Sequence, residues 1–429
     1  MIYQETLDYL FRQLPMFQRI GAVAYKKDLS NIRALCDLLG QPQTKYPTIH
    51  IAGTNGKGST AHFLAAILQA HGLKVGVHTS PHYKDFRERI KINGQYASQQ
   101  FVIDFVQNYR KDFEATQPSF FELAVAMSFE YFAQEKVDVA IIETGLGGEL
   151  DSTNIVQPIL SIITNISFDH QQFLGDTLPE IASAKAGIIK PNTPVVIGER
   201  QAETTSVFEQ KAAQEKAKII YASDHYEARF KHSNLHHTTY DTYRDNQLIY
   251  SSLQLNSIGN YQQYNLQTCL QAIEILNDSF VEIEEDKLRL GLANVKAMTR
   301  FLGRWQLIHE RPLVLGDSAH NEAGIRSAVQ FLKQMDYAQL HIVLNFSADK
   351  DLDKILPLFP EEATYYFAKA DVPRGLVADQ LMVAAQSHGL DGRAYANMQA
   401  ALNDAKRSAD EEHDLIYVGG SIYGLAEVL

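Results

Sequence analysis

Glycine, lysine and hydroxyl residues stand together in one short stretch near the N-terminal end of the chain. The apolar run Ile49–Ala52 ends in Gly-Thr-Asn-Gly-Lys-Gly-Ser-Thr at positions 53–60, and positions 61–70 then repeat apolar residues at helical spacing. A strand, a glycine-rich turn and a helix in this order present backbone N–H groups and the positive end of a helix dipole to an anion. The stretch therefore predicts a phosphate-binding loop.

Each residue type in this loop has a use toward a nucleoside triphosphate. The glycines allow close backbone approach, the lysine supplies a mobile cation, and the hydroxyl of Ser59 or Thr60 can bind Mg²⁺. The spacing differs from the usual Walker pattern, because Ile51 occupies the position of its first glycine and Gly58 separates the lysine from the first hydroxyl. An ordinary glycine-rich turn is the alternative. The candidate nucleotide-binding residues are Gly53, Thr54, Asn55, Gly56, Lys57, Gly58, Ser59 and Thr60.

Other polar residues fall where predicted strands end. Glu143 closes the apolar strand that begins at Val137, and His170 follows the strand Ile159–Ile163. Ligands of open parallel sheets sit at the carboxyl ends of the strands. Glu143 therefore suits Mg²⁺, which prefers oxygen ligands and shares phosphates, although it could also cap the following turn. His170 is either functional or an ordinary packed or surface histidine.

Three further features are ambiguous by residue type alone. Gly145–Gly148 holds three glycines, which often just make turns. Lys185 stands on a helix of small and apolar residues, where a solvated lysine is the ordinary interpretation. Asp317–Asn321 puts a carboxylate, an imidazole and an amide at another strand end, but a helix cap explains it equally well.

Strands alternate with helices along most of the chain, which predicts an α/β fold with a mostly parallel sheet flanked by helices. Residues 1–47 are expected to be helical, residues 177–189 and 259–276 also form predicted helices, and a domain boundary is expected at 297. The predicted strands are 49–52, 74–79, 137–143, 159–163 and 195–197, followed by 313–315, 341–344, 364–367 and 415–418.

Residues 221–256 interrupt this alternation with polar and aromatic residues, which predicts short hairpins. His232, His236 and His237 fall here. A metal site is possible, but solvated hairpin residues are the favoured interpretation.

Composition sets limits on the function. The chain of 429 residues is long enough for two or three domains, and its formal net charge of −12 argues against general binding to nucleic acid or anionic membranes. The two cysteines, Cys36 and Cys269, stand apart from each other and from any histidine at metal spacing. The N-terminal stretch does not look like a signal peptide and no apolar run is long enough to span a bilayer, so a cytoplasmic protein is expected.

Taken together and in order, these segments resemble the folylpolyglutamate synthase/dihydrofolate synthase family, a branch of the Mur ligase superfamily. The first loop and the paired Thr-Ser-Pro-His and Phe-Arg-Glu-Arg-Ile elements are specific to this branch. The matching segments are 51–60, 79–82, 86–90, 120–122, 143–148, 150–154, 169–170, 174–175, 185–188, 303–305, 317–321, 349–351 and 419–423.

The resemblance implies a P-loop-type ATP-binding domain over residues 1–297 and a smaller, Rossmann-like glutamate-ligase domain over 298–429. It implies an ATP-dependent ligase that adds L-glutamate to dihydropteroate, to the γ-carboxylate of a reduced folate, or to both. The terminal phosphoryl group of ATP would convert the acid into an acyl phosphate, which the glutamate amine attacks. A monomer is expected.

The resemblance also assigns site residues. Lys57, His170, Lys185 and His320 would be catalytic, with Lys185 carbamylated by CO₂ so that it becomes an anion and bridges to a second Mg²⁺. The implied metal ligands are Ser59, Glu143, His170 and Lys185, and the implied nucleotide contacts beyond the first loop are Asn265, Arg304 and Asp317. The implied substrate contacts are Ser80, Pro81, His82, Phe121 and Glu122.

The chain departs from the family pattern at four positions, namely Glu149, Ala184, Leu302 and Glu322, where Arg, Glu, Pro and Pro are usual. The charge reversal at Glu149 bears on substrate contacts but leaves the ATP and metal groups intact. Two other functions stay open, namely another Mur-type amino-acid ligase and a non-catalytic ATP-binding module. A separate N-terminal domain for a uridine nucleotide would not fit before the loop at residue 53, which disfavours the first of these.

Overall fold

The structure is a computed structural model that describes residues 2–14 and 28–429. Its residues cluster into two compact units, and the chain passes between them more than once. The first unit comprises the described residues of Met1–Asn256 together with Gln262–Phe301, and the second comprises Ser257–Tyr261 together with Leu302–Leu429.

The units divide four residues beyond the domain boundary that the sequence predicts. Position 297 lies inside helix α13 (Val295–Thr299), which packs on helix α4 (Lys57–His71) of the first unit. The division therefore comes after this short helix, at Phe301.

The first unit is built on an eight-stranded sheet in the order β4-β3-β2-β5-β1-β6-β7-β8. The strands from β2 to β8 in that order run parallel, and β3 and β4 are antiparallel additions at one edge. The predicted parallel α/β sheet is therefore confirmed. The strands are β1 (Thr48–Ala52), β2 (Val75–His78), β3 (Ile90–Ile92), β4 (Gln95–Tyr96), β5 (Val139–Glu143), β6 (Leu160–Ile163), β7 (Val195–Ile197) and β8 (Ile219–Tyr221).

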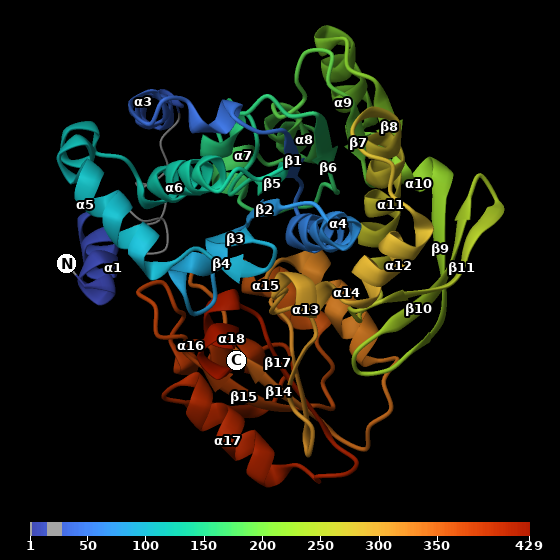
Figure 1. Cartoon of the computed structure of the whole chain (residues 1–429). Coiled ribbons are helices and arrows are strands. Elements are labelled where there is room, and N and C mark those ends of the chain that lie inside the picture. Colours follow the sequence, from blue (N-terminus) through green and yellow to red (C-terminus); the bar gives the residue numbers. More distant parts are fainter. Residues whose placement is uncertain (1, 15–27) are drawn as a thin grey trace. The chain divides into compact units, whose positions relative to one another are not determined.

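Helices cover both faces of this sheet, as Figure 1 shows for α6 on one face and α4 on the other. Alternate strand residues face opposite ways, so Ile49 and Ile51 pack with α4, α11 and α12 while Ala140 and Ile142 pack with α3 and α6. The helices are α1 (Tyr3–Gln13), α3 (Ser30–Leu38), α5 (Gln99–Thr116), α6 (Phe120–Gln134), α7 (Gln171–Leu174), α8 (Leu178–Ala186), α9 (Ala202–Glu215), α10 (Ala222–His225), α11 (Gln262–Ser279) and α12 (Glu285–Ala293).

Two predicted helices are shorter than the sequence indicates. The helix predicted from 259 begins at Gln262, because Gly259 is left-handed with φ +105°. The helix predicted over 177–189 ends at Ala186 with Gly187 as its C-cap residue, and Gly187 lies too close to Glu149 to carry a side chain. Part of the helical region predicted over 1–47, namely 15–27, lies outside the described residues.

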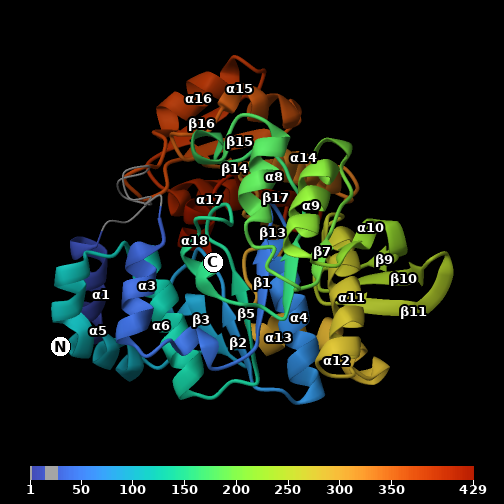
Figure 2. The same cartoon turned by 90° about the horizontal axis from the view of Figure 1, so that it is seen from above.

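The region predicted as hairpins forms a three-stranded antiparallel sheet, which lies beside α11 and α12 in Figures 1 and 2. His237 directs its Nε2 to the carbonyl of Ala293 at 3.0 Å, which is a packing contact. The strands are β9 (Tyr226–Ser233), β10 (Thr238–Arg244) and β11 (Gln247–Leu255).

The second unit is a smaller α/β domain with a six-stranded sheet in the order β12-β13-β17-β14-β15-β16, in which only β12 is antiparallel to its neighbour. Its strands are β12 (Gln306–His309), β13 (Leu313–Gly316), β14 (Leu340–Leu344), β15 (Thr364–Ala368), β16 (Gly392–Tyr395) and β17 (Leu415–Gly419). Its helices are α14 (Glu322–Leu332), α15 (Leu352–Ile355), α16 (Ala378–Gln386), α17 (Met398–Ser408) and α18 (Ile422–Val428).

Across residues 2–14 and 28–429, each helix is too short or too polar to cross a bilayer.

Candidate active site

The glycine-rich loop joins β1 to α4, as the sequence predicts. Gly53 and Gly56 both have positive φ, at +145° and +88°. A side chain at Gly53 would overlap Thr164, and one at Gly56 would overlap the amide of Asn265. Glycine is therefore required at both positions, and Asn265, which was predicted to contact the nucleotide, lies against the loop.

The first turn of α4 has the geometry of an anion-binding site. The first hydrogen bond of the helix runs from the Thr60 N–H to the Gly56 carbonyl, so the N–H groups of Lys57, Gly58 and Ser59 have no partner within the helix. Among the described residues, the buried hydroxyls of Ser59 and Thr60 also lack a hydrogen-bond partner. Buried hydroxyls are normally satisfied, so these two suit a phosphate-bound cation such as Mg²⁺.

Two lysines share one carbonyl of this loop. Lys57 donates to the Gly53 carbonyl at 3.1 Å, and the buried Lys185 donates to the same oxygen at 2.9 Å. Burial, together with repulsion from Lys57, lowers the pKa of Lys185 to about 7, against the attraction of Asp169 and Asp151. Lys185 is therefore not the solvated lysine of the ordinary interpretation, and a large share of its amine is neutral near pH 7.

Glu143 lies beside the same helix N-terminus. It is the last residue of β5, it is buried, and its carboxylate would be 3.7 Å from a Cβ built on Gly58. The carboxylate also accepts the backbone N–H of Ser80 at 3.2 Å. Ser80, predicted as a substrate contact, is thus placed next to Glu143, where its hydroxyl is a further candidate oxygen ligand.

His170 stands at the start of α7 in a left-handed conformation with φ +52°, and its N–H is bonded to the Asp169 carboxylate at 3.0 Å. The negative charge of Asp169 attracts the ammonium group of Lys185, so the segment that carries His170 interacts electrostatically with a lysine at the phosphate loop. Over residues 2–14 and 28–429, no three His, Cys, Asp or Glu side chains gather into a metal cluster. The predicted ligand set instead includes a hydroxyl and a lysine, and phosphate oxygens and water would supply the other ligands that Mg²⁺ prefers.

Asp151 organises the second glycine-rich turn, a role that residue types alone did not indicate. Its buried carboxylate accepts the N–H groups of Gly145 and Leu146 at 2.8 Å each and two further hydrogen bonds from Thr153. The turn then passes so close to the ring of Phe121 that a side chain at Gly145 would overlap it. The turn is therefore fixed next to a predicted substrate residue.

An aromatic cluster surrounds His82. Its Nδ1 accepts from Arg89 Nε at 2.8 Å, and the rings of Phe11 and Phe120 lie within 6.5 Å of it. Burial, with repulsion from Arg89, lowers the pKa of His82 to about 3, so the ring is neutral. A neutral, aromatic-lined surface suits a flat heterocycle. Pro81, beside it, is exposed.

Glu122 has a structural role at the start of α6. Its carboxylate accepts the N–H of Ser119 at 2.6 Å, while the Ser119 hydroxyl accepts the N–H of Glu122 at 3.2 Å. This reciprocal pair is a capping box. The predicted contact of Glu122 with substrate stays a prediction.

The second unit holds three predicted residues. The carboxylate of Asp317 accepts from the Tyr261 hydroxyl at 2.7 Å, from the Trp305 N–H at 3.0 Å and from the Ala319 N–H at 2.8 Å. Arg304 donates to the Ser318 hydroxyl, and His320 Nδ1 lies 3.0 Å from the Ser318 carbonyl. The helix cap at this strand end comes from Asn321, not from Asp317. The predicted contacts of these residues with ATP stay predictions.

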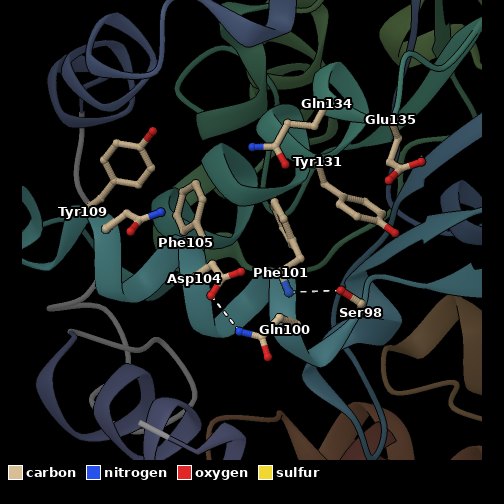
Figure 3. A pocket seen from close by; sticks show the side chains of 10 residues that line it. Ser98, Gln100, Phe101, Asp104, Phe105, Tyr109, Tyr131, Gln134 and Glu135 are labelled. Carbon is tan, nitrogen blue, oxygen red and sulfur yellow. Dashed lines mark hydrogen bonds between the residues drawn. The ribbon is translucent and has the colours of Figure 1, made fainter.

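A cavity of about 460 Å³ lies on α5 and α6 and contains none of these residues. Figure 3 shows Phe101, Tyr131 and Asp104 on its walls, with Asp104 bonded to Gln100. Another wall residue, Glu135, is already paired with Lys74. The cavity therefore shares no side chain with the predicted site.

Comparison with known proteins identifies the family of the chain. Residues 51–273 match the Mur ligase middle domain, and residues 303–422 match the Mur ligase glutamate ligase domain. The chain belongs to the Mur ligase family. It is 34% identical over 414 residues to the dihydrofolate synthase/folylpolyglutamate synthase of Bacillus subtilis, covering 94% of each chain.

Solved structures place the chain in the folylpolyglutamate/dihydrofolate synthase branch of the Mur ligases. Mycobacterium tuberculosis folylpolyglutamate synthase, complexed with ADP and AMPPCP, is 31% identical with a TM-score of 0.86, over 99% of this chain and 97% of the other. Escherichia coli FolC, in complex with DHPP and ADP, is 27% identical with a TM-score of 0.85, over 100% and 97%. The predicted family and fold are confirmed, and this Mur ligase is an ATP-dependent ligase.

Proposed function

We propose that this Mur ligase joins L-glutamate to the carboxylate of a pterin acid, either dihydropteroate or a reduced folate, with ATP as the phosphoryl donor. One observation carries the proposal. The phosphate loop gathers an anion-binding helix N-terminus, the carboxylate of Glu143 and the near-neutral Lys185 in one place. The names of the relatives supply the substrate class.

The reaction needs little covalent chemistry from the protein. The terminal phosphoryl group of ATP moves to a carboxylate oxygen, giving ADP and an acyl phosphate. The glutamate amine then attacks the acyl carbon, phosphate leaves, and the amine loses a proton. The carboxylate and ATP are both anions, and their repulsion is the main barrier to phosphoryl transfer. The loop N–H groups and Lys57 hold the phosphates and reduce this repulsion by neutralising phosphate charge.

Mg²⁺ fits the donors present. Ser59, Glu143 and His170 would hold it, with Ser80 beside Glu143 as a further oxygen donor. When bound, it neutralises phosphate charge and orients the terminal phosphoryl group. Two ions would serve the two ends of the transfer.

Lys185 fits carbamylation by CO₂. A neutral amine is the nucleophile, and the amine of Lys185 is partly neutral near pH 7 because its pKa is lowered to about 7. Addition of CO₂ forms an N–C bond and releases a proton, so the side chain becomes an anion. An anionic side chain beside Lys57 replaces the repulsion between two ammonium groups with attraction and offers oxygens to a metal.

The remaining roles rest on position. His82 and Phe121 offer aromatic surface for the pterin ring, and Asn265 lies at the loop for the nucleotide. In the second unit, Arg304, Asp317 and His320 are assigned to ATP. A monomeric, cytoplasmic protein remains the expectation.

The proposal is tested by ADP release from the purified protein with ATP, Mg²⁺ and L-glutamate. Dihydropteroate and tetrahydrofolate are supplied in turn, and a reaction without a pterin acid is the control. We expect ADP release that depends on both glutamate and at least one pterin acid. Release with both acids would show a bifunctional enzyme. Release with neither, but with a nucleotide-linked muramyl substrate, would assign the chain to another Mur ligase activity.

A further inference from the structure

The phosphate loop is held in place by the residues that follow β6. Thr54 and Asn55 donate their N–H groups to the Asn165 carbonyl at 2.9 Å and to its Oδ1 at 3.0 Å. Thr54 and Ser167 exchange two more hydrogen bonds, at 3.0 and 3.1 Å, and Thr164 donates to the Asn55 carbonyl. These bonds turn the N–H groups of Thr54 and Asn55 toward the protein and leave those of the next turn available to an anion.

The residues that follow β7 form hydrogen bonds with the segment after β6, residues 164–167. The Glu199 carboxylate accepts from Asn165 Nδ2 at 3.3 Å. Gln201 accepts the Ile166 N–H at 2.9 Å and donates to the Ile166 carbonyl at 2.8 Å. The chain of contacts therefore runs from β7, through the segment after β6, to the phosphate loop.

Glu199 determines which way the Asn165 amide points. Burial raises the pKa of Glu199, while the hydrogen bond from Asn165 favours its ionised form. In that form the carboxylate can only accept hydrogen bonds, so it takes the NH₂ end of the amide. The carbonyl end of Asn165 is then directed at the Asn55 N–H, as observed. The reversed amide would set a carbonyl oxygen against a carboxylate and an NH₂ group against an N–H donor, leaving both ends unsatisfied.

Gln201 fixes the middle of the same segment. Its amide makes both backbone hydrogen bonds of the buried Ile166, in the manner of a neighbouring strand. The segment continues to Asp169 and His170, and the Asp169 carboxylate attracts the ammonium group of Lys185. The two hydrogen bonds from Gln201 to Ile166 therefore hold a segment that contacts the phosphate loop at one end and carries His170, a predicted metal ligand, at the other.

We propose that Glu199 and Gln201 are positioning residues for ATP, which act through Asn165 and Ile166 to hold the phosphate loop in its anion-binding shape. This inference rests on the proposed function in that ATP is the nucleotide held. It is tested by binding of ADP, which does not depend on which acid the enzyme uses.

The experiment measures the Kd of Mg²⁺–ADP by calorimetry and the KM for ATP, beside the melting temperature without nucleotide. Loss of the partly buried hydrogen bond to Asn165 in Glu199→Ala is expected to raise the Kd and the KM for ATP about tenfold. The KM values for glutamate and the pterin acid should stay within about twofold, since neither contacts this segment in the proposal. Glu203→Ala is the matched control, because Glu203 is an exposed acid on the first turn of α9.

A swap of the two side chains separates positioning from simple packing. Asn165→Asp sets two carboxylates against each other and should weaken ADP binding more than Glu199→Gln does. In the double variant that carries both changes, the new amide at position 199 can donate to the new carboxylate at position 165. The other oxygen of that carboxylate still accepts the Asn55 N–H, so binding should recover to within about threefold of the parent protein. Gln201→Glu keeps the acceptor and loses the donor, and should raise the Kd by a smaller factor.

An unchanged Kd in Glu199→Ala, or a double variant no better than Asn165→Asp, would overturn the proposal. If Glu199→Ala does not fold, the swap and Gln201→Glu give the same decision. The two proposals can fail independently. If the parent protein binds ADP but releases no ADP from ATP in the substrate assay, the proposed function is contradicted, while the effect of Glu199 on ADP binding can still be measured.

Discussion

Replacement of Lys185 by alanine is expected to lower ligation by at least about 1000-fold, since it removes an anion from the site of phosphoryl transfer. The reason lies in the surroundings of the side chain. Lys185 is buried, shares the Gly53 carbonyl with Lys57, and has a pKa lowered to about 7. An uncharged amine in this position can take up CO₂ and become the carboxylate-like group that the metal needs.

The rescue of this variant distinguishes the carbamate from a simple cation. Acetate or formate should restore part of the activity of Lys185→Ala, because a free carboxylate can occupy the vacated volume. Lys185→Arg keeps a positive charge but offers no neutral amine near pH 7, so it should be as inactive as the alanine variant. An arginine variant with near-normal turnover would show that a cation suffices and would contradict carbamylation.

The pH dependence of carbamate formation follows from the same pKa. The neutral amine is the minor form below pH 7 and the major form above it, so carbamate should increase as the pH rises from 6 to 8. Carbon-isotope-labelled bicarbonate and NMR give the measurement. A carbamate signal that is absent at pH 8 in active enzyme would refute the assignment.

Glu143→Ala is the second change expected to have a large effect, with a loss of at least about 100-fold in kcat, because a metal that neutralises phosphate charge is worth several kcal/mol to the transition state. The carboxylate stands beside the first turn of α4 and accepts the Ser80 N–H at 3.2 Å. His170→Ala should lose activity for the same reason. The measurement is ADP release across a range of Mg²⁺ concentrations.

Glu143→Gln is the matched control for the metal assignment. The amide keeps an oxygen that can accept the Ser80 N–H and preserves the volume of the side chain, but it lacks the charge. We expect a raised requirement for Mg²⁺ with an unchanged melting temperature. Turnover equal to that of the parent protein at limiting Mg²⁺ would remove Glu143 from the metal site.

The sequence predicts the loop and the sheet well, because their signals are local. Glycines, a lysine and hydroxyls in one turn identify the phosphate loop, and the structure gives two of these glycines positive φ. Apolar runs identify the parallel strands. Helix ends are predicted less accurately, as at Gly259 and Gly187, where the fold brings the glycine backbone close to Trp305 and to Glu149, which are distant in sequence.

Residues that act through distant partners could not be found in the same way. Ser80 lies beside Glu143 because β2 and β5 are neighbours in the sheet, and strand order is not visible in a single sequence. Asp151 and Glu199 likewise act through backbone groups and an amide that the fold brings to them. Lys185 shows the opposite case, since its residue type favoured a solvated side chain while the fold buries it.

The most direct test of the account follows the oxygen atoms of the pterin acid. If its carboxylate is labelled with a heavy oxygen isotope and allowed to react with ATP and glutamate, activation as an acyl phosphate predicts that one labelled oxygen appears in the released phosphate. Inorganic phosphate that carries no label, in a reaction that forms the glutamate product, would contradict the central claim that the loop directs the terminal phosphoryl group of ATP onto the acid.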